Sequence, residues 1–135
     1  MIYLLDTCAV SDFIKGIPAT LKQVKEKEPG MIAISSISRM EIEYGLRLNP
    51  ERAKKILPVL QAFLSSIRIQ PFGDADAQAA GAIRAALKRE GRPIGSYDVL
   101  IAGTALARGL ILVTSNTGEF SRIGGLLLED WRTGT

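Results

Sequence analysis

Five short segments with the character of strands, separated by helical segments, constrain the fold of this 135-residue chain more than any other feature. Two of them, IYLL and MIAIS, are uninterrupted apolar runs, as expected for strands covered on both faces. Strands that alternate with helices favour a parallel sheet, because a parallel pair needs a crossover connection. We therefore expect one α/β domain over residues 1–135, with a central, mainly parallel sheet flanked by helices. The expected strands cover residues 2–5, 31–35, 67–71, 110–114 and 126–130.

Glycine and proline mark the ends of the helices that we expect between these strands. Gly16, Gly91 and Gly109 each follow a helical segment and end it. A further helix begins at Pro50, and Pro58 should kink or split it. The other expected helices cover residues 10–15, 18–28, 38–48, 74–90 and 98–108.

The composition excludes several kinds of chemistry. Histidine is absent and Cys8 is the one cysteine, which rules out His-dependent catalysis, His-ligated metals and an intramolecular disulfide. A single thiol, no apolar run long enough to span a membrane and no signal-peptide pattern lead us to expect a cytoplasmic protein without membrane association. The net charge of +3 is compatible with a nucleic-acid partner but does not require one. Acid–base or metal chemistry must therefore use carboxylates.

Two acidic residues follow expected strands. Asp6 comes directly after the first strand, and Glu119 lies in the loop TSNTGEF after the strand at 110–114. Ligands of open α/β sheets bind at the carboxyl ends of the strands, so both positions are candidates for a site. The alternatives are that Asp6 only caps the next helix and that Glu119 is a solvated loop acid. Asn116, in the same loop, can cap a helix or bind a metal.

Glu41 lies within an apolar stripe of the helix at 38–48, whereas Glu43 lies opposite it and should be solvated. We expect this stripe to face the core, where a carboxylate is costly unless something compensates it. The alternative is a capping box, S-x-x-E, in which Glu41 bonds back to Ser38. The apolar residues of the stripe are Ile37, Met40, Tyr44 and Leu48.

Asp98 opens the helix DVLIAGTALA, whose face around it is apolar. The alternative reading is an acid favoured by the helix macrodipole, although Ser96 offers a competing cap. Taken together, Asp6, Glu41, Asp98 and Glu119 predict a cluster of carboxylates at one edge of the sheet. Such a cluster repels itself unless a cation such as Mg²⁺ or Mn²⁺ binds it, and that cation can activate water against a phosphodiester.

The motifs that carry these residues form a recognisable series. They are LLDTC, ISSISRMEIEYG, RPIGSYDVLIAGTALARG and LVTSNTGEFSRIGGLLLEDW, and they extend over almost the whole chain. In order and spacing the chain resembles the PIN-domain ribonucleases, specifically the VapC-type toxins of toxin–antitoxin pairs.

The resemblance implies a role for each acidic position. It makes Asp6 and Asp98 the principal ligands of Mg²⁺ or Mn²⁺, and Glu41 and Glu119 the residues that complete the cluster. Thr7 and Asn116 fall where the family supports its site by hydrogen bonds. Two residues depart from the family pattern. Cys8 stands where the family usually has asparagine, and Thr104 where relatives often have histidine.

The resemblance also implies a function and partners. These are metal-assisted cleavage of RNA, often tRNA or ribosomal RNA, a homodimer, and inhibition by an antitoxin that inserts an arginine into the acidic pocket. The alternative is a PIN-like module that binds RNA or protein without cutting. A phosphatase with Asp6 as nucleophile is disfavoured, because such enzymes generally need a second aspartate where Cys8 stands. Cys8 itself is expected to be a small packing residue.

Overall fold

The computed structural model describes residues 2–133, and its five strands form one sheet in which every neighbouring pair is parallel. The strand order β3-β2-β1-β4-β5 places the first strand at the centre of the sheet. The predicted α/β fold with a parallel sheet is therefore confirmed, and each predicted strand is present. The strands are β1 (Tyr3–Leu5), β2 (Ile32–Ser35), β3 (Arg68–Gln70), β4 (Ile111–Val113) and β5 (Leu127–Glu129).

Helices fill the connections between the strands, and three of them begin earlier than the sequence predicted. The first starts at Thr7 because Asp6 caps it, the third starts at Ser36 because Ser35 caps it, and the sixth starts at Ser96. Pro58 does not divide the fourth helix, and its exposed position leaves water access to the carbonyl that proline cannot bond. The helices are α1 (Thr7–Ile14), α2 (Pro18–Glu26), η1 (Pro29–Met31), α3 (Ser36–Leu48), α4 (Pro50–Ser66), α5 (Asp74–Arg89), α6 (Ser96–Arg108) and α7 (Thr117–Phe120).

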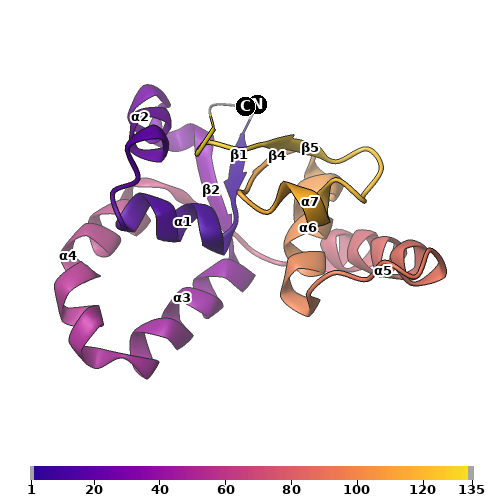
Figure 1. Ribbon diagram of the computed structural model, residues 1–135, viewed down its shortest axis with the longest axis horizontal. Coiled ribbons are helices and arrows are strands. Elements are labelled where there is room, and N and C mark those ends of the chain that lie inside the picture. Colours follow the sequence, from indigo (N-terminus) through magenta and orange to yellow (C-terminus); the bar gives the residue numbers. More distant parts are fainter. Residues whose placement is uncertain (1, 134–135) are drawn as a thin grey trace.

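The helices cover the two faces of the sheet in two groups (Figure 1), with α1 to α4 on one side and α5 to α7 on the other. Alternate residues of the central strand serve the two cores, since Leu4 packs with α5 and α6 whereas Leu5 packs with α1 and α4. None of the helices in the described range 2–133 has the length and apolar content needed to cross a membrane. The two cores fix the sheet, and with it the strand ends that carry the candidate site.

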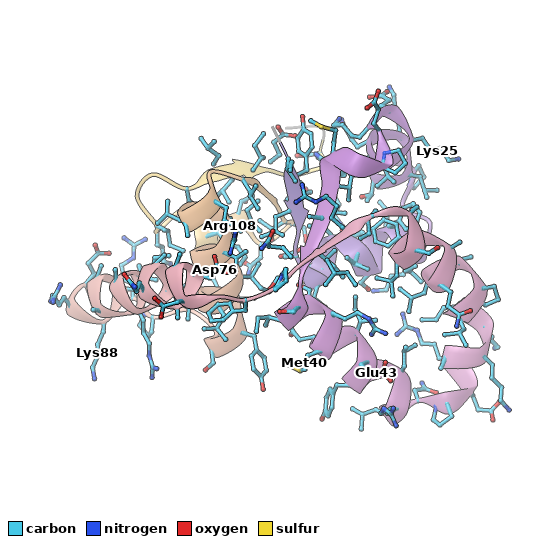
Figure 2. All side chains as sticks on the ribbon, turned by 180° about the vertical axis from the view of Figure 1, so that it is seen from behind. Lys25, Met40, Glu43, Asp76, Lys88 and Arg108 are labelled. Carbon is cyan, nitrogen blue, oxygen red and sulfur yellow. The ribbon has the colours of Figure 1, made fainter. Side chains whose placement is uncertain are left out.

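Of the apolar stripe of α3, Ile37 packs against the core, but the other three apolar residues do not, so the prediction was wrong for them. Met40, Tyr44 and Leu48 are 41%, 63% and 66% exposed, and Figure 2 shows Met40 on the outer side of α3. Ile42 and Leu46 of the same helix pack against the core instead. Met40, Tyr44 and Leu48 therefore form an apolar surface strip on α3. The position of Glu41, which is partly buried, has to be explained by other contacts.

A close approach of α5 and α6 holds the second side of the sheet together. A Cβ atom at Gly103 would lie 2.8 Å from the backbone nitrogen of Ala80, so only glycine permits this distance. Near the end of α6, Arg108 donates two hydrogen bonds to Asp76, at 3.0 and 3.2 Å, and Figure 2 shows the two residues between these helices. Because α6 begins with the segment that contains Asp98, this packing also positions that residue.

We predict that Gly103→Ala lowers the free energy of unfolding by about 1–3 kcal/mol, because the new methyl group overlaps the α5 backbone. The matched control is Gly81→Ala on α5, where a Cβ atom meets nothing within 4 Å. That substitution should raise the stability by about 0.5–1 kcal/mol through helix propensity. Urea unfolding of both variants measures the difference, and equal effects would contradict the packing argument.

Candidate active site

Asp6 occupies the junction between β1 and α1, at the centre of the sheet's carboxyl edge. Its N–H donates to the carbonyl of Val113 at 3.0 Å, which continues the pairing of β1 with β4. Its carboxylate accepts a bond from the N–H of Ala9 at 2.8 Å and a further bond from the hydroxyl of Thr114. Asp6 is therefore a helix cap, as the alternative reading held, and it also lies at the point where a ligand of the sheet would bind.

The environment of Asp6 disfavours its charge. The residue is 2% exposed, and burial raises the pKa of its carboxyl from 3.8 to about 6. The bonds from Thr114 and Ala9 lower this pKa, whereas the charges of Asp98 and Asp12 raise it further. Two hydrogen bonds thus fail to offset burial, and the neighbouring acids add to the cost of the charge.

Asp98 stands in the first turn of α6 and is the acid that links the others. Burial is the largest cause of its raised pKa, and the charges of Glu119 and Glu41 raise the pKa further. The residue at the helix cap is Gly95, not Ser96 as the sequence suggested. A Cβ atom at Gly95 would lie 3.1 Å from the Oδ2 atom of Asp98, so glycine leaves room for this carboxylate.

Glu41 faces α1 across the site. The hydroxyl of Thr7 donates to the Oε1 atom of Glu41 at 2.7 Å, which joins α1 to α3. The capping box with Ser38 is not formed, because α3 starts at Ser36 and its cap is Ser35, whose hydroxyl accepts from the N–H of Ile37. Glu41 is therefore available to the cluster, with Thr7 orienting one of its oxygens.

The loop after β4 brings the fourth acid. The side-chain amide of Asn116 donates to Glu119, which lies in α7. The N–H of Asn116 in turn donates to the hydroxyl of Thr114 at 2.9 Å, and Thr114 bonds to Asp6. A chain of hydrogen bonds thus runs from the central acid to the acid in α7.

Thr114 is a supporting residue that the sequence interpretation did not include. It is 1% exposed and bonds to the carboxylate of Asp6. Its place at the carboxyl end of β4, next to β1, is the same signal that identified Asp6.

Cys8 is exposed at the site and is not a core packing residue, so that expectation was wrong. Partial burial, followed by the charges of nearby carboxylates led by Asp6, raises the pKa of its thiol to about 11. The thiol is therefore protonated near neutral pH and is a poor nucleophile.

The donor set suits a hard divalent cation. All four acids supply oxygen, and the raised pKa values of Asp6 and Asp98 mean that an added positive charge would relieve them. Within residues 2–133, no group of three or more acidic or cysteine side chains is close enough to hold a metal ion by itself. Mg²⁺ is commonly held by one or two carboxylates and keeps several waters, so it does not need such a group.

Comparison with known families gives one description for most of the chain. The family model named PIN domain matches residues 3–126. The chain is 44% identical over 131 residues to the tRNA(fMet)-specific endonuclease VapC of Shigella flexneri, covering 96% of this chain and 97% of that protein. The protein of the same name from Salmonella typhimurium is 40% identical with the same coverage.

Solved structures give the same picture. VapBC2 from Rickettsia felis, crystallised with a DNA fragment from its promoter, matches with a TM-score of 0.88 and 34% identity, covering 97% of this chain and 99% of that one. DNA-bound VapBC from Salmonella typhimurium matches with a TM-score of 0.86 and 39% identity, covering 97% and 98%.

We predict that Asp6→Asn stabilises the metal-free protein at neutral pH. A carboxyl whose pKa is raised from 3.8 to about 6 on folding contributes stability that is present below pH 3.8 and lost as the pH rises through 6. Asparagine has no charge to bury, so the substitution removes this loss of stability, and it keeps an oxygen for the helix cap. The gain in the free energy of unfolding over the wild type should grow with pH to as much as about 3 kcal/mol.

Urea unfolding in chelator between about pH 4 and pH 8 measures this gain. The control is Glu28→Gln, because Glu28 is an exposed acid in the segment after α2. Added Mg²⁺ should stabilise the wild type but not Asp6→Asn. A gain that does not change with pH would contradict the burial argument.

Proposed function

Because this chain belongs to the PIN domain family and, within it, to the VapC ribonucleases, we propose that it cleaves RNA as the toxin of a toxin–antitoxin pair. The observation that carries the proposal is the electrostatic coupling of four carboxylates, since the charges of Glu41 and Glu119 act on Asp98 and that of Asp98 acts on Asp6. The chain acts as one nuclease domain, in the cytoplasm where its RNA substrate is found.

In this proposal, Asp6 and Asp98 hold Mg²⁺ or Mn²⁺. The bound cation supplies positive charge that polarises the phosphodiester and makes water a stronger nucleophile. Asp6 is fixed by Ala9 and Thr114, so its carboxylate is oriented before any ligand binds.

Glu41 and Glu119 handle the attacking water in the same proposal. Glu41 has one oxygen held by Thr7, and Glu119 is held by Asn116, so each presents a positioned acceptor to the site. Each can orient the water or accept its proton as the bond to phosphorus forms. Neutral Cys8 takes no part in the proton transfer.

The RNA class follows from the relatives. The Shigella flexneri and Salmonella typhimurium proteins are named for cleavage of tRNA(fMet), and the high identity supports a tRNA as the substrate here. Tyr97, which is 51% exposed and directly precedes Asp98, can stack an unpaired base beside the acids.

The antitoxin is proposed to bind a groove between α1, α3 and α4. Its volume is about 190 Å³, and Thr7 and Glu41 line it together with apolar side chains that include Val10, Ile42 and Leu60. The groove is therefore mostly apolar, with Glu41 in its lining, although Asn49 and Arg52 also line it. A helix or strand with an apolar face and one arginine fits it, since arginine would pair with Glu41.

We predict that purified protein, freed of antitoxin, cleaves a tRNA(fMet) transcript in Mg²⁺ or Mn²⁺ and not in chelator. Asp6→Asn and Asp98→Asn should each lower the rate by about 10²-fold or more, because they remove a carboxylate from the metal. Glu43→Gln is the control, since Glu43 pairs with Arg39 and Arg47 on the outside of α3. RNA binding without cleavage by the folded wild type would favour the non-catalytic module.

A homodimer is proposed through the exposed strip on α3, because three large apolar side chains lie exposed along one face of this helix. Replacing Tyr44 and Leu48 together by lysine should convert the dimer to a monomer in sedimentation experiments. Val59→Lys, at a 51% exposed position of α4, is the matched control and should leave the dimer intact. A monomeric wild type, or a dimer that survives the double substitution, would contradict this interface.

A further inference from the structure

An ion pair joins the end of the described chain to α1 beside the acidic site. Arg132 donates from Nε to the Oδ2 atom of Asp12 and from Nη2 to its Oδ1 atom, both at 2.8 Å. Asp12 is 5% exposed, whereas the side chain of Arg132 is 47% exposed. The pair therefore has a buried acidic half and an accessible basic half, and the proposed catalytic cluster uses neither.

Arg132 is held in place from several directions. The neighbouring Trp131 is 3% exposed, packs on the ring of Tyr3 and donates its indole N–H to Glu129 at 2.9 Å. The backbone N–H of Arg132 donates to Asp130 at 2.9 Å. The backbone that carries the guanidinium is therefore held in place, which reduces the conformational entropy that the side chain would lose on binding a ligand.

The pair lies one helical turn beyond Cys8 on α1. Asp12 is six residues beyond Asp6, or about 9 Å along the helix. At that separation the charge of Asp12 still acts on Asp6. The N–H of Thr114 also donates to the carbonyl of Glu129 at 3.0 Å, so the chain leading to Arg132 leaves the sheet beside the site.

The geometry of the pair leaves binding capacity on the guanidinium. Arginine has five N–H donors, and the bonds from Nε and Nη2 to Asp12 use two of them on one edge. The second donor of Nη2 and one donor of Nη1 lie together on a second edge. A planar edge with donors of this kind matches two oxygens of a phosphate.

We propose that Arg132 binds a phosphate of the RNA backbone beside the cleaved bond, and that Asp12 is the positioning residue that fixes its orientation. This rests on the proposed ribonuclease activity of the same site. An acidic site repels the RNA backbone, so a fixed cation at its rim is needed to hold the strand. The pair with Asp12 keeps Arg132 from turning into the carboxylates.

The competing explanation is a purely structural tie between α1 and the end of the chain. A second pair offers a matched control, because Arg108 bonds Asp76 in the same two-point manner and Asp76 is fully buried. Arg108 is ten residues beyond Asp98 on α6, or about 15 Å along the helix, and is therefore far from the acids. Loss of either arginine leaves a buried carboxylate without its partner, but in this proposal only Arg132 contacts the substrate.

The test compares Arg132→Gln with Arg108→Gln in the full chain. Binding of a tRNA(fMet) transcript is measured at several salt concentrations in the Asp6→Asn background, which prevents cleavage. Arg132→Gln should weaken binding about tenfold and lower the salt slope by about one. Arg108→Gln should change neither, although both substitutions lower the melting temperature. Asp12→Asn should weaken binding but keep the slope, because the charge of Arg132 remains.

A double substitution, Asp12→Asn with Arg132→Gln, separates the binding effect from a loss of stability, because it leaves no unpaired buried carboxylate. It should bind as weakly as Arg132→Gln while recovering stability. Equal binding and equal salt slopes for the Arg132 and Arg108 variants would overturn the proposal. Wild-type cleavage of the same transcript is read separately: binding without cleavage defeats the ribonuclease assignment but still decides the role of Arg132. A folded wild type that does not bind this RNA overturns both.

Discussion

The buried carboxylate of Asp6 is the constraint on which the rest of the site depends. It ends the central strand in a place that water scarcely reaches. Among the residues that the structure describes, the N–H of Ala9 and the hydroxyl of Thr114 offset its charge. A carboxylate in such a place is either protonated or compensated by a cation. The acids around it, Asp98 and Asp12, make the first outcome more favourable in the absence of a cation. The fold thus stores an electrostatic cost at the point where a divalent ion would remove it.

The parallel sheet assembles the site from distant parts of the chain. The central strand has β2 and β4 as its neighbours, and both of these strands lead into segments that carry site residues. The segment after β2 brings Glu41, and the segment after β4 brings Asn116 and Glu119. Asp98 comes instead from the start of α6, whose position is set by its contact with α5 at Gly103. A change in the packing of that helix pair would therefore move one acid relative to the other three.

The sequence predicted the features that have local causes. Strand segments, helix ends and acids at strand ends each follow from a few neighbouring residues, so the sheet and the candidate acids could be named in advance. The α3 stripe was misassigned because a periodic apolar face looks the same whether it packs on a core or lies on the surface, as Tyr44 does. The pair between Asp12 and Arg132 joins residues 120 positions apart, and no local pattern in one sequence indicates it. Thr114 was the exception, since its position at the end of a predicted strand was a local signal that the interpretation left unused.

The central claim is that the four carboxylates form a site for a divalent cation, and the most direct measurement is a crystal structure of the wild type grown with Mn²⁺. The anomalous signal of manganese identifies the ion without reference to activity. The account predicts a peak within about 2.0–2.2 Å of carboxylate oxygens of both Asp6 and Asp98, with waters completing the coordination. Manganese bound elsewhere, with Asp6 and Asp98 in contact only with protein and water, would contradict it.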